Sequence, residues 1–139
     1  MFKKNFWIRK DDVKTINHKI KNFIYILNLF RNVKYKWGGK TFKGIDCSGL
    51  VQIIYNYNNK FFPRDTIDQI KLKKGLKSKK KFKKGDIVFW KGHVGICLNS
   101  TKFIHAYGPR KKVLIMPINQ TIKLIEKTAG LKVKKIFSI

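Results

Sequence analysis

Cysteine is the residue of this chain best suited to covalent chemistry, and Cys47 stands in a run that favours its activation. The run is Gly44-Ile45-Asp46-Cys47-Ser48-Gly49-Leu50-Val51, a glycine-bounded turn that leads into an apolar stretch. The apolar residues have the spacing of a helix that buries one face, so Cys47 belongs to the first helical turn. There, free backbone N–H groups and the helix dipole favour the nucleophilic thiolate. The alternative is a small, inert, buried side chain, as is common for free cysteines.

Two histidines supply a candidate base for this thiol. Alternation of apolar and polar residues predicts strands over 93–98 and 102–107. If the loop between them is centred on Asn99, His93 lies directly opposite His105, with Cβ atoms ~4.5–5.5 Å apart. The two imidazoles are then expected to touch on one face of the sheet. Gly95 shares that face and leaves room for the helix that carries Cys47.

A thiol hydrolase needs a thiolate at a helix N-terminus, an imidazole within hydrogen-bond reach and a third group that holds the imidazole tautomer. Cys47, His93 and His105 match these roles in that order, with His105 in place of the usual Asn or Asp. Two other interpretations stay open on spacing alone. The histidines can be paired core residues that satisfy each other, or all three side chains can ligate zinc.

The elements that position these side chains predict an α+β fold. Helices are expected over 15–32, 47–58 and 66–72, and the first ends near Asn32, which tolerates a left-handed backbone. The first helix owes its apolar face to Ile16, Ile20, Phe23, Ile24, Leu27 and Phe30. Later the period shifts to that of strands, over 86–90, 93–98, 102–107 and 112–116, before a helix over 118–126 and a strand over 131–137. We therefore expect the N-terminal helices to pack on one face of a C-terminal antiparallel sheet.

Length and composition indicate one globular domain with a basic surface. The chain has 139 residues, with 33 Lys and Arg against 7 Asp and Glu, for a net charge of +26. Residues 1–14 show no period and are expected to form an arm before a single domain over 15–139. The charge is expected to attract polyanions nonspecifically. Specific nucleic-acid binding is not expected, because only four basic residues are Arg and no recognition motif is present.

The sequence shows no targeting signal. Its N-terminus lacks the apolar region of a signal peptide, and the apolar run over 23–30 is shorter than the ~20 residues of a membrane span. Two cysteines cannot form a disulfide framework for a chain of this length, which fits a reducing compartment. These features favour a cytoplasmic protein without a membrane span, with the periplasm or cell wall as the alternative location. A monomer is expected.

Six motifs, in this order and at these intervals, resemble the NlpC family of bacterial cell-wall cysteine peptidases over about residues 16–137. They are Tyr35-Lys36-Trp37-Gly38-Gly39, the run from Gly44 to Gln52, Pro63-Arg64-Asp65-Thr66, the run from Lys84 to Trp90, His93-Val94-Gly95-Ile96 and Ile104-His105-Ala106. The resemblance implies a papain-like α+β fold with no metal or other cofactor. It also implies hydrolysis of the bond between γ-D-glutamate and a diamino acid in peptidoglycan stem peptides or muropeptides.

The resemblance implies a catalytic role for four residues. Cys47 matches the nucleophile of the family, His93 its base and His105 the residue that orients the base. Tyr35 matches a tyrosine whose hydroxyl faces the nucleophile. This hydroxyl is expected to hold the oxyanion together with the backbone N–H of Cys47.

Four more residues match positions that contact substrate in the family. Asp46 and Ser48 flank the nucleophile, and Asp46 is suited to bind a free amino terminus. Arg64 and Asp65 match positions that line the same groove, and Arg64 is suited to bind a substrate carboxylate. A capped turn is the alternative explanation for Arg64 and Asp65.

Two rival functions differ from this one. The first is a catalytically silent module that binds cell wall or polyanions, but such a module would normally have lost Cys47 or His93, and both are present. The second keeps the thiol chemistry with another substrate, as in a related thiol amidase or acyltransferase, including a phage-type lysin. The sequence shows neither an export signal nor wall-binding repeats. This favours an intracellular enzyme that acts on released muropeptides, or a partner that supplies targeting.

Overall fold

The computed structural model describes residues 7–10, 13, 15 and 17–139. Five antiparallel strands form the main sheet in the order β6-β5-β4-β3-β7. These strands are β3 (Asp86–Trp90), β4 (His93–Cys97), β5 (Lys102–Tyr107), β6 (Lys112–Pro117) and β7 (Lys135–Ser138). A small hairpin joins β1 (Lys40–Thr41) to β2 (Gly44–Ile45). The helices are α1 (Phe23–Leu29), α2 (Cys47–Asn56), α3 (Thr66–Gln69) and α4 (Ile118–Ala129).

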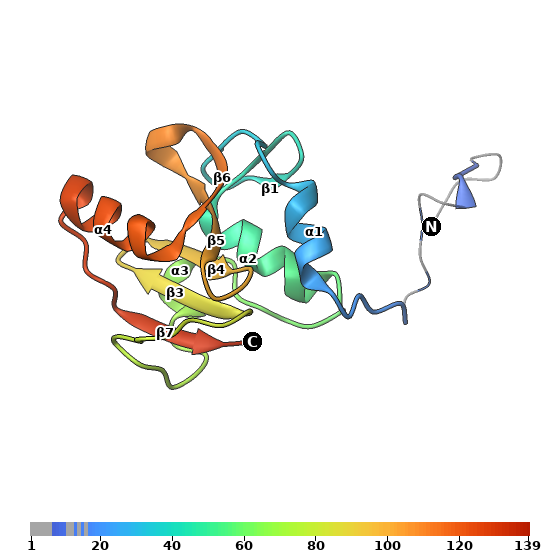
Figure 1. Ribbon diagram of the computed structural model, residues 1–139. Coiled ribbons are helices and arrows are strands. Elements are labelled where there is room, and N and C mark those ends of the chain that lie inside the picture. Colours follow the sequence, from blue (N-terminus) through green and yellow to red (C-terminus); the bar gives the residue numbers. More distant parts are fainter. Residues whose placement is uncertain (1–6, 11–12, 14, 16) are drawn as a thin grey trace.

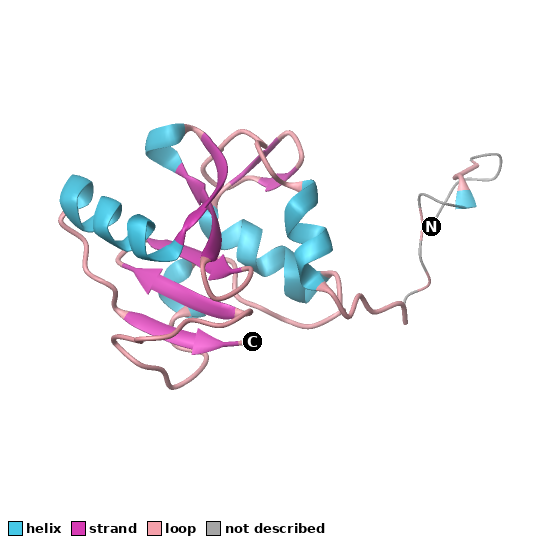
Figure 2. Ribbon diagram, in the orientation of Figure 1, coloured by secondary structure: helices cyan, strands magenta, loops and turns pink. Residues whose placement is uncertain are grey.

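Two hydrophobic clusters, one on each face of the main sheet, hold the helices against it. The first cluster packs α1 and α2 against Val94, Ile96 and Ile104. The second includes Ile118 and Ile125 of α4 and packs them on the other face. Figures 1 and 2 show α4 on one side of the sheet and the pair α1 and α2 on the other. The predicted α+β class is confirmed, including the N-terminal helices on one face.

The first helix is shorter than its apolar pattern predicts. The side chain of Asn22 accepts the backbone N–H of Ile24 at 3.3 Å and caps the helix there. The N–H of Ile20 instead binds Oδ1 of Asn58 at 2.9 Å, which ties the preceding chain to the turn after α2. The prediction of a helix is therefore wrong over the described residues before α1. Asn32 does take a left-handed backbone, with φ of 65°.

Part of the N-terminal prediction lies outside the described residues. Positions 1–6, 11, 12 and 14 belong to the expected arm, and Ile16 belongs to the expected apolar face of the first helix. Within the described part of the chain, no helix has the length and apolar character needed to cross a membrane.

The register of β4 and β5 differs by two residues from the predicted one. Ile96 pairs with Ile104 and Cys97 with Phe103, so the loop is centred on Ser100 rather than Asn99. The reason is the side chain of Asn99, whose Oδ1 accepts three hydrogen bonds from Thr101 and Lys102 and so begins a tight turn. His93 therefore does not lie directly opposite His105, and the predicted pairing is wrong.

A buried ion pair fastens the lysine-rich segment over 71–84 to the sheet. Asp86 is fully buried, and its carboxylate accepts hydrogen bonds of 2.6 Å from Lys79 Nζ and from Ser138 Oγ. The backbone N–H of Lys83 adds a third bond at 2.9 Å. Burial by itself would raise the pKa of Asp86, but these bonds outweigh burial and hold the pKa below its usual value. The carboxylate is therefore an anchor between β3, β7 and the segment.

We expect Asp86→Ala to lower the free energy of unfolding by about 2–3 kcal/mol, because it removes several hydrogen bonds to a buried charge. Urea unfolding followed by circular dichroism measures this loss. The matched control is Asp68→Ala, which breaks an ion pair to Lys71 in which both side chains are well exposed. The control should cost less than about 1 kcal/mol, and equal losses in the two variants would contradict the anchoring role.

Candidate active site

Helix α2 begins at the candidate nucleophile because Asp46 caps it. Asp46 Oδ1 accepts the backbone N–H of Gly49 at 2.8 Å, and Oδ2 accepts the N–H of Gly38 at 2.8 Å. One carboxylate therefore joins the first turn of α2 to the turn before β1. Gly49 is required here because a Cβ atom would lie 2.7 Å from the carbonyl oxygen of Gly39 and 3.0 Å from Asp46 Oδ1. The predicted helix start at Cys47 is confirmed.

Arg64 completes this arrangement through a two-point ion pair with Asp46. Its Nη1 lies 2.9 Å from Oδ1 and its Nη2 2.6 Å from Oδ2. Nη1 also donates to Ser48 Oγ at 2.8 Å, and Nη2 to the carbonyl oxygen of Gly39 at 3.3 Å. Arg64, Asp46 and Ser48 are thus brought together as a network that shapes the start of α2. Their predicted contacts to substrate stay predictions.

The thiol of Cys47 is buried against the turn between β3 and β4. Its Sγ donates to the carbonyl oxygen of Gly92 at 3.9 Å. Burial raises the pKa of Cys47 to about 11, although backbone N–H groups, above all that of Val94, act in the opposite direction. The expected preference for the thiolate at the helix N-terminus is therefore outweighed, and the resting group is a thiol. Gly92 and Val94 are the neighbours of His93 in the chain.

The two histidines are in contact although their strand register is not the predicted one. His93 Nε2 and His105 Nδ1 lie 2.9 Å apart. Burial lowers the pKa of His93 to about 4. Burial, with a smaller effect of His93, lowers the pKa of His105 to about 3. Both rings are therefore neutral near pH 7, so one nitrogen of the pair donates and the other accepts.

The sequence predicts that helix α2 approaches the sheet on the face that Gly95 shares with His93. This prediction is wrong. A Cβ atom on Gly95 would lie 2.3 Å from the ring of Phe103, so the space at this glycine serves Phe103. The helix packs on the opposite face, because that face presents the apolar side chains of Val94 and Ile96. Cys47 instead reaches the end of β4, where the strand turns at Gly92.

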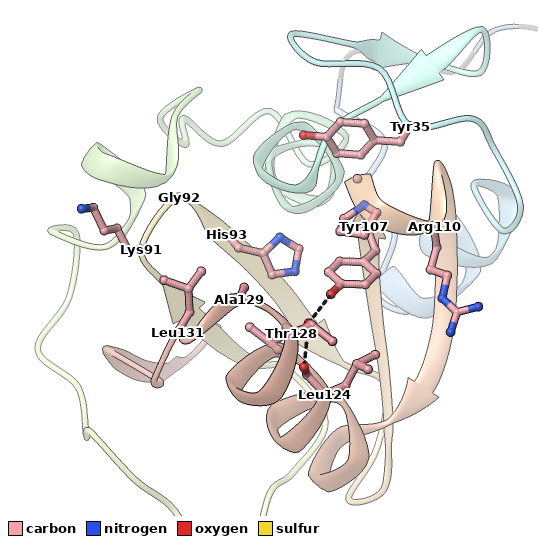
Figure 3. A pocket seen from close by; sticks show the side chains of 13 residues that line it. Tyr35, Lys91, Gly92, His93, Tyr107, Arg110, Leu124, Thr128, Ala129 and Leu131 are labelled. Carbon is pink, nitrogen blue, oxygen red and sulfur yellow. Dashed lines mark hydrogen bonds between the residues drawn. The ribbon is translucent and has the colours of Figure 1, made fainter.

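Tyr35 lies close enough to Cys47 and Asp46 for their charges to act on its hydroxyl. Its backbone pairs with Ile45, just before Asp46, and its N–H donates to the carbonyl oxygen of Lys111 at 2.9 Å. Burial raises the pKa of Tyr35, and the negative charges of ionised Cys47 and of Asp46 raise it further. The phenol therefore stays a neutral hydrogen-bond donor. Figure 3 shows Tyr35 and His93 lining one pocket.

Two pockets meet at Gly92, which lines both. The smaller, of about 60 Å³, is lined by Asp46, Cys47, Ser48 and Asp65 among others. The larger, of about 410 Å³, is lined by Tyr35, Lys91, Gly92, His93, Tyr107, Gly108, Pro109, Arg110, Leu124, Ile125, Thr128, Ala129 and Leu131. Asp65 is exposed and lines the smaller pocket, and its side chain makes no capping bond at the start of α3.

Three residues that sequence reasoning missed support the site. Gln69 is fully buried and donates to the carbonyl oxygens of Ser48 at 3.0 Å and Pro63 at 2.9 Å, which links α3 to α2. Gly92 supplies the carbonyl beside the thiol, and Tyr107 stacks on His105 with ring centroids 4.9 Å apart. The turn Lys91-Gly92 before His93 was a usable signal for Gly92. Nothing in the sequence pattern distinguished Gln69 or Tyr107.

The zinc interpretation gains no support from the geometry. Among the described residues, no three or more side chains of His, Cys, Asp or Glu converge as a metal site would require. The observed contact is between two imidazoles, and the thiol donates to a backbone carbonyl.

A model of the NlpC/P60 family matches residues 32–128, which is more than half of the chain. The chain belongs to the NlpC/P60 family. The matched segment includes both the start of α2 and the histidine pair.

Relatives of this NlpC/P60 domain carry the names of peptidases, and one of these names refers to murein. It is 35% identical over 101 residues to a gamma-D-glutamyl-L-lysine dipeptidyl-peptidase of Bacillus subtilis, covering 67% of this chain and 34% of that protein. It is 34% identical over 99 residues to the murein DD-endopeptidase MepS/murein LD-carboxypeptidase of Escherichia coli K12, covering 66% of this chain and 50% of that protein. The chain thus spans half or less of the length of these two relatives.

A solved structure supports the same fold. The crystal structure of an NlpC/P60 family protein from Bacillus cereus superposes with a TM-score of 0.75 at 27% identity, covering 94% of this chain and 45% of that one. The NlpC/P60 fold predicted from six short motifs is confirmed.

The neutral resting thiol leads to a prediction for alkylation. In a Cys97→Ala variant, Cys47 is the only thiol, and its reaction with iodoacetamide requires the thiolate. Because burial raises the pKa of Cys47 to about 11, the rate should rise about tenfold per pH unit between pH 7 and about 10. Stopped-flow or mass-spectrometric alkylation measures it. A rate independent of pH between 5 and 8 would instead indicate a preformed thiolate and imidazolium pair.

Proposed function

We propose that this NlpC/P60 domain is a cysteine peptidase that hydrolyses the bond between γ-D-glutamate and a diamino acid in peptidoglycan stem peptides or muropeptides. The observation that carries the proposal is the contact between the Cys47 thiol, at the capped start of α2, and the carbonyl of Gly92. Gly92 directly precedes His93, which pairs with His105. The activities named for the two relatives support the substrate class.

In the proposed first step, Sγ of Cys47 attacks the γ-carbonyl carbon while the thiol proton passes to His93. A concerted transfer fits the resting state, since the pKa of Cys47 is raised and that of His93 is lowered by burial. The carbonyl oxygen becomes an oxyanion, which the N–H of Cys47 and the neutral hydroxyl of Tyr35 stabilise.

His105 orients the base in this mechanism. If Nε2–H of His93 donates to Nδ1 of His105, the other nitrogen of His93 is free to accept the thiol proton. The pKa of His105, lowered to about 3 mainly by burial, keeps this partner a neutral acceptor. When the tetrahedral intermediate collapses, the C–N bond breaks and His93 returns the proton to the leaving amine. Water then hydrolyses the thioester.

The acyl half of the substrate is proposed to occupy the smaller pocket beside Cys47. Its free amino terminus approaches the carboxylates of Asp46 and Asp65, which line that pocket. Asp46 is already paired with Arg64, so Asp65 is the carboxylate with more capacity for a new ammonium group. Ser48 and Arg64 hold Asp46 in place at this pocket through their hydrogen bonds to its carboxylate.

We predict that Cys47→Ala abolishes release of the diamino-acid product from a purified stem tetrapeptide, because it removes the thiol that would form the thioester. Mass spectrometry of the digest measures the products. The matched control is Cys97→Ala, which removes a buried thiol on the opposite face of the sheet and should keep most of the activity. Equal activity of the Cys47→Ala variant and the unmodified protein would rule out the nucleophile assignment.

The two histidines should differ in their effect on kcat. His93→Ala is expected to lower kcat by about 10³-fold, within the range for loss of a general base. His105→Ala should cost less, because it removes only an orienting hydrogen bond, and His105→Asn should recover part of the loss by restoring an acceptor. Steady-state kinetics on a soluble tripeptide compares the three variants. A larger loss for His105→Ala would mean that the roles are exchanged.

A further inference from the structure

The larger pocket, of about 410 Å³, is separate from the one that contains the candidate nucleophile. His93 lines this pocket and Cys47 does not, whereas Cys47 lines the smaller pocket and His93 does not. Gly92 lies between them and lines both. In the proposed reaction, His93 gives its proton to the leaving amine, so the leaving group must lie beside His93. The larger pocket is therefore where the leaving half of the substrate fits.

The two pockets differ in charge as well as in position. The smaller one is lined by Asp65 and by Asp46, whose carboxylate is paired with Arg64, so Asp65 supplies its unpaired negative charge. Among the described residues that line the larger one, the groups charged near pH 7 are the cations Lys91 and Arg110, and none is a carboxylate. Figure 3 shows Lys91 and Arg110 at opposite edges of the pocket. A substrate is thus expected to lie with its ammonium end at one pocket and carboxylate groups at the other.

The wall between these cations is mostly apolar. Helix α4 contributes Leu124, and the segment after it contributes Leu131. The hydroxyls of Tyr107 and Thr128 lie 3.4 Å apart, and Thr128 Oγ1 donates to the carbonyl oxygen of Leu124 at 2.7 Å, so the polar atoms of this wall already have partners. Such a wall suits the methylene groups of a long side chain, whose polar end then reaches the cationic edges.

We propose that this pocket binds the leaving diamino acid and that Arg110, together with Lys91, makes the domain selective for a diamino acid whose side chain ends in a carboxylate as well as an amine. A side chain that ends in a lone ammonium, as in lysine, is repelled by the same two cations. Both cations are exposed and neither is engaged in a salt bridge among the described residues, so they are available to a carboxylate. The inference rests on the proposed function and adds the choice of leaving group to it.

The test compares two tripeptides, L-Ala-γ-D-Glu linked to diaminopimelate and L-Ala-γ-D-Glu linked to L-lysine, by kcat/KM of the full chain. We expect the unmodified protein to prefer the diaminopimelate substrate by about tenfold, as for one to two partly exposed charge contacts. Arg110→Glu should reverse the preference toward lysine, mainly through KM, with kcat changed less than about twofold. Lys91→Glu is a second variant, on the other edge of the pocket, with the same expected direction.

The matched control is Lys123→Gln, which removes an exposed cation of α4 that lines neither pocket. The control should keep both the activity and the preference of the unmodified protein. If the unmodified protein cleaves both tripeptides equally and Arg110→Glu and Lys91→Glu leave the ratio unchanged, the inference is overturned while the proposed function stands. If it releases neither diamino acid, the proposed function itself fails.

Discussion

The carboxylate of Asp46 is the constraint on which the site depends. It caps α2, accepts the N–H of Gly38 and receives two hydrogen bonds from Arg64, so one buried group fixes three separate segments. Charge-assisted, two-point bonds of this kind are stronger and more directional than neutral ones. Cys47 directly follows this carboxylate, so the position of the thiol is set by the cap. A glycine at position 49 is what allows the segments to come so close.

Burial, rather than the helix dipole, decides the protonation states of Cys47, His93 and His105 in the resting site. The dipole and the surrounding N–H groups favour a thiolate at Cys47, yet removal from water costs the charged form more. The same cost keeps His93 and His105 neutral. The resting site therefore holds a neutral thiol and two neutral imidazoles, and in the proposed mechanism charge develops only when the thiol attacks the substrate. Gly92 separates a pocket that contains Asp65 from one that contains Lys91 and Arg110, and in our proposal this difference in charge orients the substrate.

The predicted contact between His93 and His105 is correct, although the predicted register of β4 and β5 is wrong. Strand alternation places residues 93 and 105 on one face in either register, because the two registers differ by an even number. The long imidazole side chains then span the diagonal and meet at 2.9 Å. What changes is the residue opposite His105, and with it the function of Gly95, which accommodates Phe103.

The sequence by itself determined the chemical groups and most of the elements, but not the start of α1. Helical spacing after Cys47 and strand alternation after residue 86 are local signals, since each depends on which face of one element is apolar. Only the tertiary structure decided where these elements meet. It placed α2 on the face of the sheet that presents Val94 and Ile96 rather than on the face of Gly95. It also paired Arg64 with Asp46 and formed a pocket lined by His93, Lys91 and Arg110. Such contacts join residues distant in the chain, and they depend on packing and charge balance, which no single stretch of sequence contains.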